Sequence, residues 1–336
     1  MAANRLPVVP LHALPVGQLV DCFALLAEKN RQATRDGKVF YTCRFRDKLR
    51  SVACVVWSDG PWFDACERIW KEGECYKLRV VYSEHERFGP QIELHNIRPV
   101  TDADQADGFE LSQLVESSRF PIEQLWQQLA ELVETQLRDP WRQLVRLLLN
   151  NHEVKIKRLP ASEKQYYPFV GGWLEHTLSV CHLVSWLAEY YGHFYPNLQP
   201  PINRDLVLTA AILHEIGRVL EFGDEVVQPQ PTVPGRLLGN IALTRDLIHQ
   251  AATQVPDLNP EQLLLLDHLI LSYLNLPEWG SPRLPMIPEA LILHHADDLD
   301  AKMEMYYRCL SRDVGPGPFT ARDPILGRPL LKQRYC

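Results

Sequence analysis

Five side chains whose types could do chemistry lie in three apolar segments of the chain. The segment GGWLEHTLSV holds His176, and TAAILHEIGRVLEF holds His214 and Glu215. The segment ALILHHADDLDAKM holds Asp297 and, three positions later on the same helical face, Asp300. A buried charge is costly unless it is paired or binds a metal ion, so acids in such surroundings indicate a cation.

Imidazole nitrogens combined with carboxylate oxygens are donors suited to Mn²⁺, Fe²⁺, Zn²⁺ or Ni²⁺. An ion held in this way lowers the pKa of bound water and polarises a phosphoryl oxygen. The residue types therefore favour metal-assisted hydrolysis of a phosphoester. A His-Glu pair alone is more often structural, and these side chains could instead only hydrogen-bond to one another, but three such segments in order favour the metal.

The period of the apolar residues indicates that helices carry these side chains. From residue 120 to about residue 310, apolar residues recur at intervals of three and four. Neighbouring helical positions diverge by about 100°. His214 and Glu215, expected within one continuous helix, can therefore both reach an ion in the groove beside that helix.

The first hundred residues have a different period. Apolar side chains alternate at period two between turn residues, which predicts five strands. The expected strands cover 18–28, 39–46, 51–57, 76–82 and 91–98, with a helix over 62–71. A helix between the third and fourth of five strands is the order of the OB barrel, a fold that often binds single-stranded nucleic acid.

One face of this predicted barrel is basic. Alternation along the second and fourth strands turns one set of side chains inward and leaves an aromatic residue and several cations outside. Such a face offers a surface for base stacking and partners for phosphates. The predicted nucleic-acid contacts are Phe40, Arg44, Arg46, Lys48, Lys77 and Arg79. The alternative is that these residues form only the solvated face that every barrel has.

The composition limits the class of protein. The 336 residues carry 35 Lys and Arg against 42 Asp and Glu, so nucleic-acid binding needs a local patch rather than the net charge of −7. Eight scattered cysteines without a CxxC pair argue against a zinc ribbon, an iron–sulfur site or a disulfide framework. No apolar run approaches the roughly 20 residues that span a bilayer, so we expect a cytoplasmic protein without a membrane partner.

Several segments resemble the HD superfamily of metal-dependent phosphohydrolases, whose pattern is a His, then His-Asp, then a distant Asp. Within that superfamily the match is closer to YhaM-type 3′-to-5′ exoribonucleases. The segments are FVGGWLEHT, LHEIGRVLEF, GNIALT, HLILSYLN, PEWGSPRLPMIPEALILHHADDLDAKM and LGRPL. The resemblance implies an α+β multidomain protein, with an N-terminal five-stranded OB-like β-barrel followed by an all-α HD-type helical domain.

The resemblance assigns the metal ligands residue by residue. The family's first histidine falls on His176, its His-Asp pair on His214 and Glu215, and its terminal aspartate on Asp297. Glu215 thus stands where the family has Asp, which keeps the charge but lengthens the ligand by one methylene. Catalysis tolerates such a shift of the metal poorly.

Two further groups of positions bear on catalysis. Arg218 stands where relatives carry Lys and would hold a substrate phosphate, with a salt bridge to Asp300 or Glu221 as its structural alternative. The extra histidines of two-metal relatives are replaced here, at Tyr166, Tyr167, Asn240, Tyr273 and Leu274. The resemblance therefore implies one divalent ion, Mn²⁺ before Mg²⁺, Fe²⁺, Ni²⁺ or Zn²⁺, or none if the site has decayed.

We predict an OB-like domain over 1–100, a linker and connecting helices over 101–150, an HD-type domain over 151–312 and an extended tail over 313–336. The leading hypothesis is a 3′-to-5′ exoribonuclease for single-stranded RNA or DNA, with Glu215 and Arg218 in catalytic roles. An inactive HD-like protein that binds single strands or serves as a scaffold is the alternative. A nucleotide phosphohydrolase fits the helical half but leaves the barrel unexplained, and a homo-oligomer is compatible with each hypothesis.

Overall fold

The computed structural model describes residues 6–85, 89–224, 229–313 and 315–333. These residues form two compact units that divide between Ser117 and Ser118. Each unit has its own cluster of buried apolar side chains. Within the described ranges, no helix is long and apolar enough to cross a membrane.

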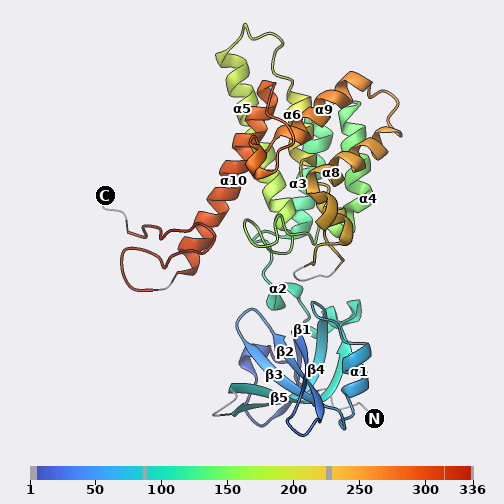
Figure 1. The fold of residues 1–336 in the computed structure, drawn as a ribbon, viewed down its shortest axis with the longest axis vertical. Coiled ribbons are helices and arrows are strands. Elements are labelled where there is room, and N and C mark those ends of the chain that lie inside the picture. Colours follow the sequence, from blue (N-terminus) through green and yellow to red (C-terminus); the bar gives the residue numbers. More distant parts are fainter. Residues whose placement is uncertain (1–5, 86–88, 225–228, 314, 334–336) are drawn as a thin grey trace. The chain divides into compact units, whose positions relative to one another are not determined.

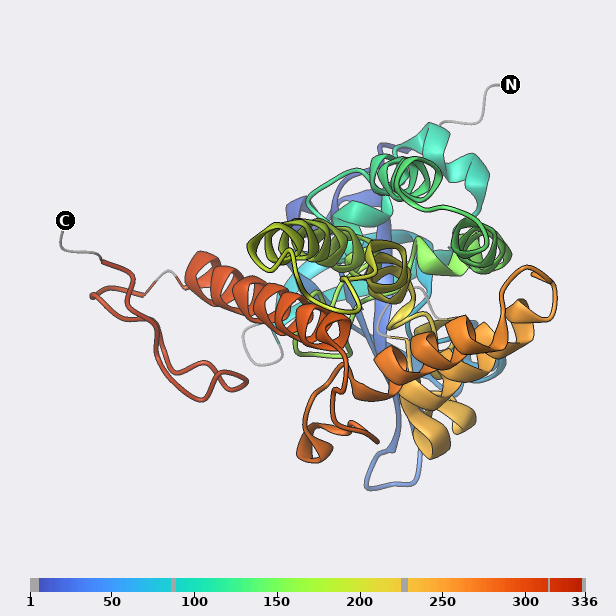
Figure 2. The same cartoon turned by 90° about the horizontal axis from the view of Figure 1, so that it is seen from above.

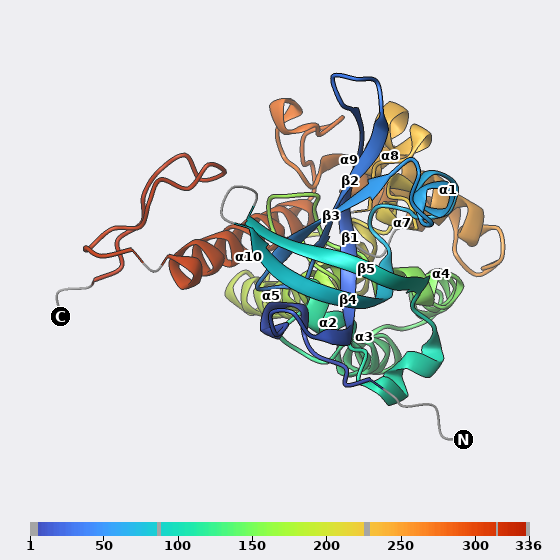
Figure 3. The same cartoon turned by 90° about the horizontal axis from the view of Figure 1, so that it is seen from below.

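The first unit is a closed barrel of five strands (Figure 1 and, from below, Figure 3). The strands are β1 (Leu19–Ala33), β2 (Val39–Arg46), β3 (Ser51–Trp57), β4 (Cys75–His85) and β5 (Gly89–Pro99). Their order around the barrel is β1-β2-β3-β5-β4, and a short parallel contact of β3 with β5 closes it. Together with helix α1 (Phe63–Arg68) between β3 and β4, this is the predicted OB-like arrangement.

Side-chain alternation separates the inside of the barrel from the outside. On β2 the buried residues are Tyr41, Cys43 and Phe45, whereas Arg44 between them is exposed. β2 and β3 have the predicted bounds, but β1 continues five residues beyond the predicted end. It does so because a bulge after Leu26 lets its second half keep pairing with β2, as far as Ala33.

The acidic segment 101–108, predicted as part of a linker, is regular and held against the barrel. Residues Asp102–Asp107 form a 3₁₀ helix, η2, which a capping box of Thr101 and Asp104 begins. Asp104 is 2% exposed and binds Arg98 at 2.5 Å and Lys77 at 3.4 Å. The acids here neutralise cations of β4 and β5, which is a structural role that composition did not reveal.

The second unit is helical, as the period of three and four predicted. Its helices are α3 (Ile122–Gln136), α4 (Trp141–Ile156), α5 (Gly172–Phe194), α6 (Arg204–Leu213), α7 (Arg218–Glu221), α8 (Val233–Ala252), α9 (Pro260–Ser272) and α10 (Pro288–Arg312). The short elements η1 (Leu11–Ala13) and α2 (Leu111–Leu114) belong to the first unit, and η3 (Pro277–Trp279) to the second.

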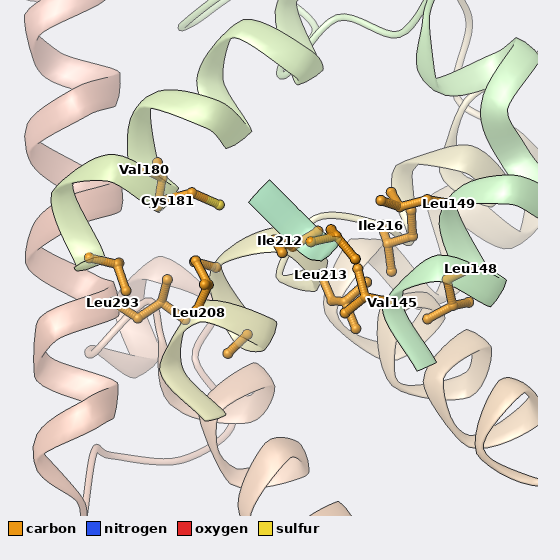
Figure 4. Close-up of a cluster of buried hydrophobic side chains, with 14 of the residues drawn as sticks. Val145, Leu148, Leu149, Val180, Cys181, Leu208, Ile212, Leu213, Ile216 and Leu293 are labelled. Carbon is orange, nitrogen blue, oxygen red and sulfur yellow. The ribbon is translucent and has the colours of Figure 1, made fainter. Parts of the chain in front are cut away.

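Helix α5 packs against α6 and lies beside α10 (Figure 2, yellow-green beside red-orange). Figure 4 shows the apolar core that joins them, with Val180 from α5, Leu208 from α6 and Leu293 from α10. Shortening such a side chain costs about 2–5 kcal/mol. This core therefore holds in place the three elements that carry the predicted metal ligands.

The segment predicted as one continuous helix around His214 is interrupted. α6 ends at Leu213, and a tight turn leads to α7, with Ile216 N and Arg218 N each donating to the carbonyl three residues earlier. A Cβ atom on Gly217 would lie 2.5 Å from backbone atoms of α8, so only glycine fits this close approach. His214 still has helical backbone angles, and its backbone nitrogen donates to the carbonyl of Ala210, but residues 214–217 form a turn, so the continuous helix expected here is interrupted.

Candidate metal centre

Three predicted ligands from three elements converge in the helical unit. His176 lies on α5, His214 follows α6 and Asp297 lies on α10. Their ligand atoms all lie within 4.8 Å of one another. Oδ1 of Asp297 is 3.1 Å from Nε2 of His176 and 3.6 Å from Nε2 of His214. Both histidines are 0% exposed and Asp297 is 7% exposed, so this His-His-Asp cluster is shielded from water.

The atoms that face the centre of the cluster make no well-aligned hydrogen bond among the described residues, although two of them, in His176 and Asp297, lie 3.1 Å from each other. They are Nε2 of His176, Nε2 of His214 and Oδ1 of Asp297. Buried polar atoms are nearly always paired, so three orphaned lone-pair donors at one point need a common partner. Two imidazole nitrogens and one carboxylate oxygen fit a divalent metal ion.

Hydrogen bonds hold the far sides of both imidazole rings. Nδ1 of His176 lies 2.8 Å from Asp300, and Nδ1 of His214 donates to the carbonyl of Ala211 at 2.8 Å. Asp300 also accepts hydrogen bonds from Ser179 and from the hydroxyl of Tyr167. Such partners orient a ring and select the tautomer whose Nε2 lone pair faces the ion.

The pKa values of His176 and Asp297 are shifted by their neighbours in the cluster. Burial by itself lowers the pKa of His176, but Asp297 and Asp300 raise it to about 10. Burial raises the pKa of Asp297, but the two histidines lower it well below its usual range. Without a metal ion the cluster therefore keeps a second proton on the His176 ring at neutral pH, and a bound cation has to displace that proton.

Glu215 lies next to this cluster but is not one of the three converging residues. Its Oε1 accepts hydrogen bonds from Arg218 at 2.5 Å and from the hydroxyl of Tyr166 at 2.8 Å, while Oε2 is buried without a partner. Arg218 also pairs with Glu221 at 2.8 Å, which is one of the two salt bridges that the sequence offered. The other candidate, Asp300, binds His176 instead.

Aromatic rings surround the histidines where the resemblance places the extra histidines of two-metal relatives. The ring of Tyr166 lies 5.1 Å from that of His176, and the ring of Tyr273 lies 5.2 Å from that of His214. Burial raises the pKa of both phenols well above its usual value. The sequence did not predict the bond from Tyr166 to Glu215, since no periodicity relates residues 49 positions apart.

The predicted nucleic-acid residues of the barrel differ in their surroundings. Phe40 faces Trp57 across the β2–β3 pair with 4.9 Å between ring centroids, and Lys38 lies over the Trp57 ring. Trp57 is 41% exposed, and the prediction missed it. Its place opposite Phe40 depends on the strand register, which one strand examined alone does not show.

The cations of the same prediction are mostly paired within the barrel. Arg79 makes two bonds to Asp21 at 2.7 and 3.0 Å, and Lys77 binds Asp107 at 2.5 Å. The exposed Arg44 lies 3.3 Å from Glu28. Two predicted residues have other surroundings, because Nε of Arg46 is buried without a partner and Lys48 is exposed.

Comparison with known proteins covers nearly the whole chain. Residues 173–302 match the HD domain family, and this range contains all three residues of the cluster. The 3′-5′ exoribonuclease YhaM of Bacillus subtilis (strain 168) is 32% identical over 91% of this chain and 92% of that protein. This chain belongs to the YhaM family of HD-domain proteins.

A second YhaM, the 3′-5′ exoribonuclease of Geobacillus sp. (strain WCH70), is 31% identical over 95% of this chain and 96% of its own length. This YhaM-family chain therefore shares both units with its relatives. Its barrel is also similar to a domain of replication protein A from Methanococcus maripaludis, 12% identical with a TM-score of 0.23, over 28% of this chain and 94% of that chain. The OB-like fold rests on the strand order of the barrel itself.

Proposed function

We propose that this YhaM-family protein is a 3′-to-5′ exoribonuclease that degrades single-stranded RNA with one divalent ion, Mn²⁺ in the first place. The observation that carries the proposal is the cluster of His176, His214 and Asp297, whose facing atoms are buried and unpaired. When bound there, the ion supplies Lewis-acid activation of water and of a phosphoryl oxygen. Relatives named as exoribonucleases support the choice of substrate.

The surrounding residues orient the ligands and exclude water. Asp300 holds the ring of His176, and the carbonyl of Ala211 holds that of His214, so neither ring needs to rotate when the ion binds. Tyr166 and Tyr273 pack against the rings and keep the cluster apart from bulk water. In such surroundings an electrostatic interaction with a phosphate is stronger than in water.

Arg218 is the residue that we assign to the substrate phosphate. Glu215 and Glu221 bind two nitrogens of its guanidinium and hold it, while its buried Nε has no partner among the described residues. The side chain is 14% exposed, so part of it is accessible. We assign Glu215 two tasks, to hold Arg218 through Oε1 and to offer Oε2 as a fourth ligand.

The barrel has the features of a grip for the RNA strand. Phe40 and Trp57 supply adjacent rings for base stacking, and Lys38 lies beside them. Lys48 and Arg44 are exposed on the same unit. Because the whole chain is acidic, we expect this binding to be local and to weaken as salt rises.

Trimming of a 5′-labelled single-stranded RNA with Mn²⁺ tests the proposal. The wild-type protein should shorten it stepwise from the 3′ end, and His214→Ala should not. His249→Ala is the matched control, because His249 pairs with Asp267 and lies outside the cluster. Equal trimming by wild type and His214→Ala would reject the site, and competition with DNA of the same sequence measures the preference for RNA.

A second function, strand binding without catalysis, is favoured by the Glu at position 215 and by the engagement of its Oε1. Elemental analysis separates the two functions. Near one equivalent of metal after reconstitution, lost in His214→Ala, supports the exoribonuclease. RNA binding without stoichiometric metal supports the scaffold.

A further inference from the structure

The helical unit contains a basic cleft that the metal cluster does not use. Beyond the cluster α10 continues to Arg312, and the tail returns against its end (Figure 1), where Asp313 binds Lys332 at 2.8 Å and the backbone nitrogen of Ala321 at 2.6 Å. A cavity of about 440 Å³ lies between helix and tail. The cations that line it are Lys164, Arg308, Arg312 and Arg322.

The two acids that line this cleft are already engaged. Asp313 is bound to Lys332, and Asp323 accepts hydrogen bonds at 2.8 Å from the backbone nitrogens that follow it. Arg312 and Arg322 are exposed. Residues 305–336 carry six Lys or Arg and only two Asp, whereas the whole chain has a net charge of −7. Two of the four lining cations already have a carboxylate partner, Lys164 with Glu163 at 3.3 Å and Arg308 with Glu304 at 3.2 Å, so phosphate binding relies mainly on the exposed Arg312 and Arg322.

The cleft lies on the helix that carries Asp297. Arg308 pairs with Glu304 at 3.2 Å, and Glu304 accepts a hydrogen bond from the backbone nitrogen of Tyr167, whose hydroxyl reaches Asp300. At about 1.5 Å per residue, Arg308 and Arg312 lie roughly 16 and 22 Å from Asp297 along the helix axis. A stacked strand advances about 3.4 Å per nucleotide, so this span corresponds to roughly five or six nucleotides.

We propose that this cleft binds backbone phosphates of single-stranded RNA about five nucleotides upstream of the 3′ end. The inference rests on the proposed function for the position of that end. Planar guanidinium groups bind phosphate oxygens in pairs and carry no base preference, as an enzyme that moves along any sequence requires. The cleft would thus hold the strand while its last nucleotides occupy the metal centre.

The test measures binding without cleavage. A fluorescent 12-nucleotide RNA is titrated with His214→Ala protein in EDTA, and anisotropy gives Kd at several salt concentrations. Adding Arg322→Glu or Arg312→Glu should raise Kd about 3- to 10-fold and reduce the salt slope by about 0.7 for each phosphate that the variant no longer binds. Arg312→Glu is the second variant because Nε of Arg322 binds the carbonyl of Gly327 and helps to shape the tail.

Arg204→Glu is the matched control, since it makes the same change of charge at an exposed position that begins α6. It should change the Kd of the 12-nucleotide RNA less than twofold. Equal behaviour of Arg312→Glu, Arg322→Glu and Arg204→Glu would overturn the proposal. So would a larger loss for a polyglutamate peptide than for RNA, which would indicate an acidic protein partner.

Failure of the cleft and failure of the exoribonuclease are distinguishable. If the wild type does not trim RNA but the arginine variants weaken binding of the 12-mer, the proposed activity is wrong and the binding site stands. If the wild type trims RNA and the arginine variants bind the 12-mer as Arg204→Glu does, the activity stands and the cleft is not a phosphate site.

Discussion

The basic strands of the barrel and the metal cluster of the helical unit satisfy their polar side chains in opposite ways. In the barrel, Lys77 and Arg79 find carboxylate partners within their own unit. In the cluster, His176, His214 and Asp297 each keep a buried atom that makes no well-aligned hydrogen bond to any described residue. The first arrangement stabilises a fold by itself, whereas the second becomes favourable only with a further ligand. Several unpaired buried atoms that converge on one point therefore indicate a site, whereas a single such atom, Nε of Arg46 in the barrel, does not.

The largest effect is expected for a change in the metal cluster, whose facing atoms make no well-aligned hydrogen bond to any described residue. His214→Ala removes one of the three converging donors, and Mn²⁺-dependent RNA trimming should fall about 10³-fold, roughly 4 kcal/mol of barrier. Metal at 100 times its Kd stabilises a protein by about 2.7 kcal/mol, so Mn²⁺ should raise the Tm of the wild type by several degrees. Scanning calorimetry should show no such rise for His214→Ala, and a rise of equal size would contradict the site.

Asp300→Asn tests whether the hydrogen bond to Nδ1 of His176 orients this ring for metal binding. Loss of the carboxylate beside Nδ1 of His176 should weaken metal affinity about 10- to 100-fold, as titration calorimetry can measure. In metal-free protein the variant should also lower the pKa of His176 below about 10, which NMR can follow. Asp298→Asn is the control, because Asp298 pairs instead with Lys302.

The same variant predicts a change in pH dependence. Because the pKa of His176 is raised from 6.5 to about 10 on folding, its contribution to stability is complete below pH 6.5 and is lost as pH rises through 10. Urea unfolding in EDTA at pH 6, 8 and 10 should therefore show a smaller loss for Asp300→Asn than for wild type. Identical pH profiles would mean that Asp300 does not determine this pKa.

Trp57→Ala tests the proposed stacking surface of the barrel, where the Trp57 ring is exposed. Base stacking on an aromatic ring contributes about 1–3 kcal/mol, so the variant should weaken RNA binding about 5- to 150-fold. Anisotropy with a short oligonucleotide measures the change, and Phe40→Ala should have an effect of similar size because the two rings are neighbours. Unchanged affinity in both variants would place the grip elsewhere.

The smallest effect is expected where charges are already paired. Lys77→Ala and Arg79→Ala should change RNA affinity less than twofold, since Asp107 and Asp21 already bind these cations. Arg79→Ala, at a partly exposed ion pair, should lower the free energy of unfolding by about 0.2–1 kcal/mol, and Lys77→Ala should lower it more because the carboxylates that pair with Lys77 are buried or half-buried. A large loss of RNA affinity here would reverse the contrast between the two units.

The predictions made from the chain held where the signal was local and periodic. The bounds of β2 and β3 follow from period-two alternation between turn residues. The predicted ligands His176, His214 and Asp297 converge, because each stands in a strongly apolar segment that folding buries. The barrel was predictable as well. Period-two alternation marks its strands, and a helix between the third and fourth of five strands indicates the OB-like arrangement.

The sequence did not reveal features that depend on contacts between residues far apart in the chain. Gly217 approaches α8, and this contact accompanies the turn over residues 214–217 that interrupts the predicted helix. The acidic residues near 104 are typical of a linker in sequence, but in the structure Asp104 pairs with Arg98 and Lys77 of the barrel. Trp57 was missed because its role as a second stacking ring depends on Phe40, which lies opposite it on the neighbouring strand.

The amino-acid sequence by itself determined which segments are helical or extended, which side chains are buried and which could donate to a metal ion. Those properties depend on residue type and spacing along the chain. Only the tertiary structure decided which donors remain unpaired, because pairing depends on neighbours far away in sequence. His176 and Asp300 are 124 positions apart, yet their 2.8 Å contact determines how a ligand faces its ion.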